Sequence, residues 1–165
     1  MNISKRIIAI IISILAFAFC LFAQTDKNAD TKKPISTYDA ELAKKLGADE
    51  YGMKQYVLVI LKTGPTKIDD KAKIQELFAG HLKNIIRLAD EGKLALAGPF
   101  VEGGNMRGLF ILNAKTIDEA KEMVKTDPAV AAGLLEPEYV KWYGSAAVMN
   151  VNDMHKKIQK TSIVD

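Results

Sequence analysis

Residues 93–113 read KLALAGPFVEGGNMRGLFILN, two apolar runs separated by a loop that holds two adjacent glycines. The runs at 93–100 and 106–113 each have the length of a β-strand, and a short glycine-bearing loop between two such runs is typical of a β-hairpin. This hairpin decides the fold, because it places two antiparallel strands in the middle of the chain. The flanking elements then determine which sheet the hairpin joins.

On the N-terminal side, residues 54–63 (KQYVLVILKT) form a strand-like run that a Gly-Pro turn closes. Residues 69–90, between this run and the hairpin, carry apolar side chains at the spacing of an amphipathic helix. The members of this stripe are Ile74, Leu77, Phe78, His81, Leu82, Ile85, Leu88 and Ala89. The sequence therefore predicts one long helix that ends near Gly92 and packs its stripe on the sheet.

On the C-terminal side, Thr116 and Glu119 have the spacing of a capping box and predict a helix that ends near Thr126. A short helical turn at 128–132 and a final strand at about 135–149 follow. The resulting order β-α-β-β-α-β predicts an α+β protein with the ferredoxin-like fold, in which both helices cover one face of an antiparallel sheet.

The predicted sheet is apolar on both faces, which bears on assembly. In the strand at 54–63, the two alternating sets are Tyr56, Leu58 and Ile60, and Val57, Val59 and Leu61. Two helices cover only one face, so the second face would expose a large apolar patch. A second copy packed sheet against sheet is the simplest cover and predicts a symmetric homodimer. The alternative is that an N-terminal helix and the C-terminal tail cover this face.

Residues 1–23 have the composition of an export signal. Lys5 and Arg6 precede a run that is apolar apart from one serine, and Ala23 supplies a small residue for cleavage before Gln24. We therefore expect an exported protein, periplasmic or secreted, that has no membrane contact after cleavage.

Two alternatives to this cleavage stay open. The run at 7–23 reaches the lower limit of about 17 residues for a membrane-spanning helix and would then be an uncleaved anchor. Cys20, the only cysteine, would otherwise carry a lipid, although the bulky Phe19 precedes it. Cleavage after Ala23 removes Cys20, and with it any disulfide or thiolate chemistry.

The rest of the chain is close to neutral and fits one domain. Once residues 1–23 are removed with their two basic and no acidic side chains, 21 basic and 20 acidic side chains remain. No basic stripe remains, so the composition excludes the usual signature of a nucleic-acid-binding protein.

We divide the chain beyond the signal into three parts. A leader at 24–53 holds a short helix over 38–46 that Gly47 ends, and its apolar side makes it a brace on the domain. The domain itself spans 54–149. Residues 150–165 are a polar tail with a frayed helix near His155.

His81 is the one residue that interrupts the apolar stripe of the long helix. It is either a core residue with a satisfied hydrogen bond or a general acid/base, since imidazole changes its protonation state near neutral pH. Asp127 is a candidate partner, although an Asp directly before Pro128 is also the usual start of a helix. From these residues alone, both interpretations stay open.

Motifs along the folded core resemble those of the YCII-related (YciI-like) domain family in residues, order and spacing over about 54–145. They are His81-Leu82, ADEGKL at 89–94, AGPF at 97–100, GLFIL at 108–112, Glu119-Ala120, TDP at 126–128 and AGL at 132–134. The resemblance implies a ferredoxin-like fold of the dimeric α+β barrel type. It also implies a pocket where the family's His and Asp meet, which map onto His81 and Asp127. Lyase-type, dehalogenation-like activity on small ring compounds is known among its members, which look largely cytoplasmic.

Two functions follow as hypotheses. In the first, His81, oriented by Asp127, moves a proton on a small molecule bound beside Gly98, Pro99 and Phe100, in a lyase- or isomerase-type reaction without cofactor or metal. In the second, the chain is a non-catalytic extracytoplasmic ligand-binding or accessory domain, and the pair is structural. No His, Asp and Glu residues have the spacing of metal ligands, so we expect no metal site.

Overall fold

The computed structural model describes residues 37–163, and the signal expected at 1–23 lies outside them. Residue contacts divide the chain into Met1–Tyr38 and Asp39–Asp165, and the second unit holds every element described below. Within the described residues, no helix is both long and apolar enough to cross a membrane.

The folded unit has the predicted order of elements. They are α2 (Ala40–Leu46), β1 (Met53–Thr63), α3 (Lys71–Asp90), β2 (Leu94–Pro99), β3 (Met106–Leu112), α4 (Ile117–Val124), α5 (Pro128–Ala131), β4 (Leu135–Ser145), the 3₁₀ helix η2 (Ala146–Asn150) and α6 (Val151–Ile158). The strands form one sheet in the order β2-β3-β1-β4, with antiparallel pairing at every step. The ferredoxin-like βαββαβ prediction is confirmed.

Side-chain caps start the helices close to where the sequence predicts. The Asp70 carboxylate accepts the backbone N–H groups of Ala72 and Lys73 and begins α3. Thr116 Oγ1 accepts the N–H of Glu119 and begins α4, as predicted. The Glu119 carboxylate reaches the N–H of Lys115 instead of that of Thr116, so the capping box closes one residue earlier than usual.

Two expectations about the ends of the domain need correction, and one is met. The last strand stops at Ser145 rather than near Met149, because its partner β1 begins at Met53, the residue paired with Ser145. The tail forms the helix α6 around His155, where the sequence predicts a helix. The N-terminal helix starts after Asp39 and buries none of its residues, so it braces the domain less than expected.

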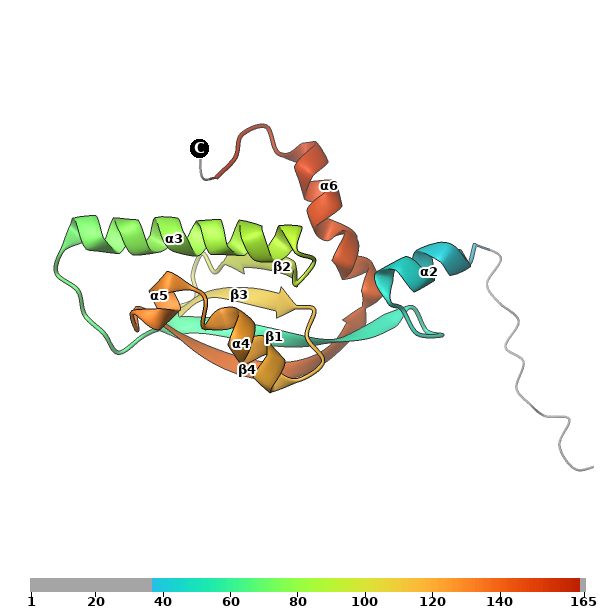
Figure 1. The fold of residues 1–165 in the computed structure, drawn as a ribbon, viewed down its shortest axis with the longest axis horizontal. Coiled ribbons are helices and arrows are strands. Elements are labelled where there is room, and N and C mark those ends of the chain that lie inside the picture. Colours follow the sequence, from blue (N-terminus) through green and yellow to red (C-terminus); the bar gives the residue numbers. More distant parts are fainter. Residues whose placement is uncertain (1–36, 164–165) are drawn as a thin grey trace, which may run out of the picture. The chain divides into compact units, whose positions relative to one another are not determined.

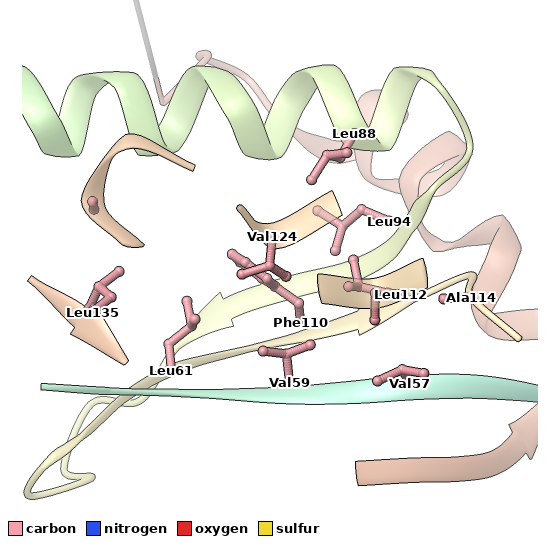
Figure 2. Packing of buried hydrophobic residues seen from close by; sticks show 12 residues of the cluster. Val57, Val59, Leu61, Leu88, Leu94, Phe110, Leu112, Ala114, Val124 and Leu135 are labelled. Atoms are coloured by element: carbon pink, nitrogen blue, oxygen red, sulfur yellow. The ribbon is translucent and has the colours of Figure 1, made fainter. Parts of the chain in front are cut away.

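Both faces of the sheet are apolar, as predicted. Helices α3, α4 and α5 lie over one face and enclose the main core with β1, β3 and the start of β4 (Figures 1 and 2). The labelled members of this core are Val57, Val59, Leu61, Leu88, Leu94, Phe110, Leu112, Ala114, Val124 and Leu135. Burial of this face fixes the distance of α3 and α5 from the sheet. It thereby fixes the positions of the residues that lie between these two helices.

The second face is covered only in part. Tyr56, Ala95 and Ile111 are buried there, and Val148 and Met149 of η2 pack against them. Val140 on the same face stays 44% exposed. The C-terminal residues therefore cover one part of this face, which is the alternative that the sequence left open, and leave another part exposed.

Candidate functional site

The structure brings His81 and Asp127 into direct contact. His81 Nδ1 lies 2.6 Å from Asp127 Oδ2, across 46 residues of sequence. The His81 side chain is 12% exposed and the Asp127 side chain is fully buried. The contact that the family resemblance implies is therefore present, while its role in chemistry stays a prediction.

Two aromatic rings hold the imidazole from its sides. The ring of Phe110, from β3, stacks on the imidazole, with 5.9 Å between the ring centroids and an interplanar angle of 26°. The ring of Phe78 meets the imidazole edge-on, with 6.0 Å between the centroids. Phe78 lies one turn before His81 on α3, so both side chains fall on the same face of the helix. The imidazole plane is thus fixed by packing as well as by its hydrogen bond.

Asp127 divides its two carboxylate oxygens between two tasks. Oδ1 accepts the backbone N–H groups of Ala129 and Val130 at 2.9 and 3.4 Å and caps α5. Oδ2 faces His81. Because an ionised carboxylate only accepts hydrogen bonds, Nδ1 of a neutral His81 must carry the proton and Nε2 must carry the lone pair. The Oδ2 atom of Asp127 therefore selects the tautomer of His81, while Oδ1 holds the cap.

A glycine in the middle of α3 allows this approach. A Cβ built on Gly80 would lie 2.9 Å from Cγ of Pro128, so any larger residue would push α5 away from α3. Gly80 is not among the functional residues predicted from the sequence. A glycine inside a helical pattern destabilises the helix by about 1 kcal/mol, so its presence indicates a close packing contact. This pattern is the sequence feature that points to Gly80.

A second set of contacts fixes the residue next to Asp127. Arg87 Nη2 donates to Asn84 Oδ1 at 2.7 Å and to Thr126 Oγ1 at 2.9 Å. Asn84 and Arg87 follow His81 along α3 at intervals of three residues. The segment that enters α5 is therefore bonded to α3 at two consecutive residues, Thr126 and Asp127.

His81 forms part of the wall of a cavity of about 330 Å³. The lining residues are Phe78, His81, Leu82, Ile85, Ala97, Gly98, Pro99, Arg107, Gly108, Phe110, Leu135 and Ile163. Gly98 and Pro99 lie in the lining, and their role in substrate binding stays a prediction. Phe100 is not among the lining residues; its Cβ packs beside Gly103 in the hairpin loop. Asp127 is also absent from the lining and lies behind the imidazole.

This arrangement suits proton transfer. Nδ1 is engaged by Asp127, so the other nitrogen of an imidazole that lines the cavity is the one available to a ligand. A positioned imidazole with an orienting carboxylate has the parts of a general acid/base. Within residues 37–163, no group of three His, Cys, Asp or Glu side chains is placed to hold a metal ion.

A large pKa shift occurs away from the cavity. The hydrogen bond from Tyr143 to the Asp49 carboxylate raises the pKa of Tyr143 to about 12 and lowers the pKa of Asp49 below its usual value. Both groups are exposed: Asp49 lies between α2 and β1, and Tyr143 lies near the end of β4. This pair belongs to the surface of the domain rather than to the site.

Comparison with known proteins places the chain in a family. The YCII-related domain family matches residues 55–143. "Uncharacterized protein YjpA" of Bacillus subtilis (strain 168) is 35% identical over 68 residues, which cover 41% of this chain and 78% of that protein. A solved structure of 5-chloro-2-hydroxyhydroquinone dehydrochlorinase (TftG) from Burkholderia phenoliruptrix AC1100, in complex with 2,5-dihydroxybenzoquinone, matches with a TM-score of 0.36 and 22% identity. That match covers 52% of this chain and 90% of TftG, and a TM-score at this level carries no inference about activity. By its domain match and its relative YjpA, the chain belongs to the YCII-related family.

Proposed function

We propose that this protein catalyses a proton transfer on a small, mostly apolar molecule, with His81 as the general acid/base and Asp127 as its orienting partner. The reaction is of the lyase or isomerase type and uses no cofactor. The observation that carries the proposal is the 2.6 Å contact between Nδ1 and Oδ2 at the wall of a cavity of about 330 Å³.

The surroundings of the pair support catalysis over a purely structural role. A buried histidine that only fills the core would have both nitrogens satisfied by protein groups. Here the described residues give Nε2 no hydrogen-bond partner, and the ring lines the cavity. Apolar walls also strengthen electrostatic interactions with a bound ligand, because they exclude water.

The proposal predicts catalysed exchange of carbon-bound protons. Wild-type protein should speed the loss of α-proton signals from a panel of small, enolisable one-ring ketones in D₂O, measured by ¹H NMR. The variant His81→Gln should lower the rate by about 10² to 10⁴, the usual contribution of a positioned acid/base. His155→Gln is the matched control, because His155 is an exposed histidine on α6. Equal rates in wild type and His81→Gln would contradict the proposal.

A second candidate function is a non-catalytic domain that binds a small ligand in the same cavity. The N-cap made by Asp127 favours it, since this residue has a structural task whether or not chemistry occurs. In that case the wild-type protein accelerates no exchange, and His81→Gln mainly lowers the melting temperature. The exchange assay and a melting curve on the same samples separate the two functions.

We also propose that the protein is a homodimer that pairs through the second face of the sheet. Leu58, Leu96 and Leu109 are only partly buried there, and Val140 is 44% exposed. A surface of this kind is typical of an interface. Light scattering at micromolar concentration should give the mass of two chains, and a monomeric mass contradicts the dimer.

Export is the third part of the proposal, supported by the sequence of residues 1–23. Mass spectrometry of the protein from its natural host should find a chain that begins at Gln24, in the periplasm or the medium. An intact chain that starts at Met1 in the cytoplasm contradicts export.

A further inference from the structure

The lining of the cavity holds two side chains that can carry a charge. Among the described residues of the lining, His81 and Arg107 are the ionisable ones, and most of the others are apolar. His81 is already engaged by Asp127. Arg107 therefore supplies the permanent positive charge of this cavity, since a guanidinium stays protonated in proteins.

The guanidinium of Arg107 has no protein partner within residues 37–163: no hydrogen bond or ion pair joins it to another described residue. The other described arginine, Arg87, shows the contrast, since it bonds to Glu91, Asn84 and Thr126. An arginine at the wall of an apolar cavity without a carboxylate of its own protein is available to an anion from outside.

The backbone of Arg107 is fixed although its side chain is exposed. The pairing of β1 with β3 shifts at this point, because Leu61 faces Gly108 while Lys62 faces Met106, which leaves Arg107 as an extra residue. Such bulges redirect side chains at functional sites. The carbonyl of Arg107 accepts the N–H of Phe100 at 3.0 Å, which ties this point to β2. The point where the Arg107 side chain leaves the backbone is therefore held in a defined place at the cavity.

We propose that Arg107 selects substrates that carry a carboxylate. The substrate class is a small, mostly apolar carboxylic acid, of the size of one ring, whose carboxylate pairs with Arg107 while its carbon skeleton lies against the apolar wall. This proposal rests on the proposed function of the cavity and adds the charge of the ligand to it. A planar guanidinium pairs with a carboxylate through two parallel hydrogen bonds, which gives orientation as well as affinity.

The test compares two ligands of nearly the same shape and different charge, benzoate and benzamide. Their dissociation constants are measured by NMR titration of the full mature chain at low salt. Wild-type protein should bind benzoate about two to five times more tightly, the range for an exposed charged pair. Arg107→Gln should bind both ligands equally and keep the affinity for benzamide. Because Arg107 is exposed, this variant should fold with an unchanged melting temperature.

Lys83→Gln is the matched control for net charge, because Lys83 is an exposed cation on α3 outside the cavity lining. It should retain the preference for benzoate. The preference should also shrink as salt is raised, since the pair is partly exposed. Equal affinity of the wild type for the two ligands, binding of neither, or an equal loss of preference in Lys83→Gln each overturns the proposal.

This binding test is independent of the exchange assay. If His81→Gln and wild type show the same exchange but the preference for benzoate depends on Arg107, the cavity binds carboxylates without catalysis. If exchange depends on His81 but wild type binds benzoate and benzamide equally, only the role of Arg107 is wrong. A contact of Arg107 with a second copy of the chain predicts this second result, together with a change in dimer stability in Arg107→Gln.

Discussion

Gly80→Ala tests whether the separation between α3 and α5 controls the His81–Asp127 pair. The new Cβ would lie 2.9 Å from Cγ of Pro128, whereas ordinary contacts begin at 3.4 Å. Relief of this overlap requires a shift of about 0.5 Å. If α5 takes up the whole shift, the contact between Nδ1 and Oδ2 lengthens from 2.6 Å to beyond the usual range for a charge-assisted hydrogen bond.

Two opposing terms set the stability of this variant. Replacement of glycine by alanine inside a helix stabilises it by about 1 kcal/mol. Overpacking of a close contact costs about 1 to 3 kcal/mol. We therefore expect a net loss of about 1 kcal/mol in the free energy of unfolding, and a fall of about 3 to 5 °C in melting temperature for a domain of this size. Denaturant titration measures the first quantity and the exchange assay reports the effect on activity.

The double variant Gly80→Ala, Pro128→Ala provides the control. Removal of the proline ring removes Cγ and leaves Cβ, which lies 3.4 Å from the new methyl group. The double variant should therefore recover the exchange rate that the single variant loses, and the two substitutions should be non-additive in stability. A stabilised Gly80→Ala variant with unchanged exchange would refute the idea that this contact sets the geometry of the pair.

Three further predictions concern single substitutions. Asp127→Asn should lower the exchange rate at least about 100-fold at nearly unchanged stability. The amide must keep its oxygen on the cap of α5 and turn its N–H₂ towards His81, which moves the ring proton to Nε2. ¹⁵N NMR of the imidazole reports this tautomer. The contact of Tyr143 with Asp49 should stabilise the fold below pH 10 and lose this effect as pH rises through about 12, since the folded pKa of Tyr143 lies above the usual value. In a ¹³C NMR titration, Asp49→Asn should bring the pKa of Tyr143 back towards 10. Thr116→Ala should reduce the free energy of unfolding by about 1 kcal/mol in a denaturant titration, because the N–H of Glu119 loses its acceptor, while exchange stays unchanged.

Local sequence patterns predicted the helices and strands of this fold. They did not predict the residues that set the distances between these elements. The alternation in β1 and the cap at Thr116 depend on neighbours within a few residues, so the sequence displays them directly. The end of β4 depends on where its partner strand begins, a non-local fact. The contact of Gly80 with Pro128 joins residues that lie far apart in sequence, and no local pattern of either residue shows it.

The sequence offered two interpretations of Asp127, a helix cap and a partner of His81, and the two are compatible. The helix-start pattern and the acid/base partner compete only if one carboxylate serves one task, and the structure gives each oxygen its own. Loss of stability in an Asp127 variant therefore says nothing by itself against a catalytic role. Asp127→Ser separates the tasks, because serine still caps a helix but its shorter side chain does not reach His81. If the exchange rate survives in Asp127→Ser, the carboxylate does not orient the imidazole, and the cap is its whole contribution.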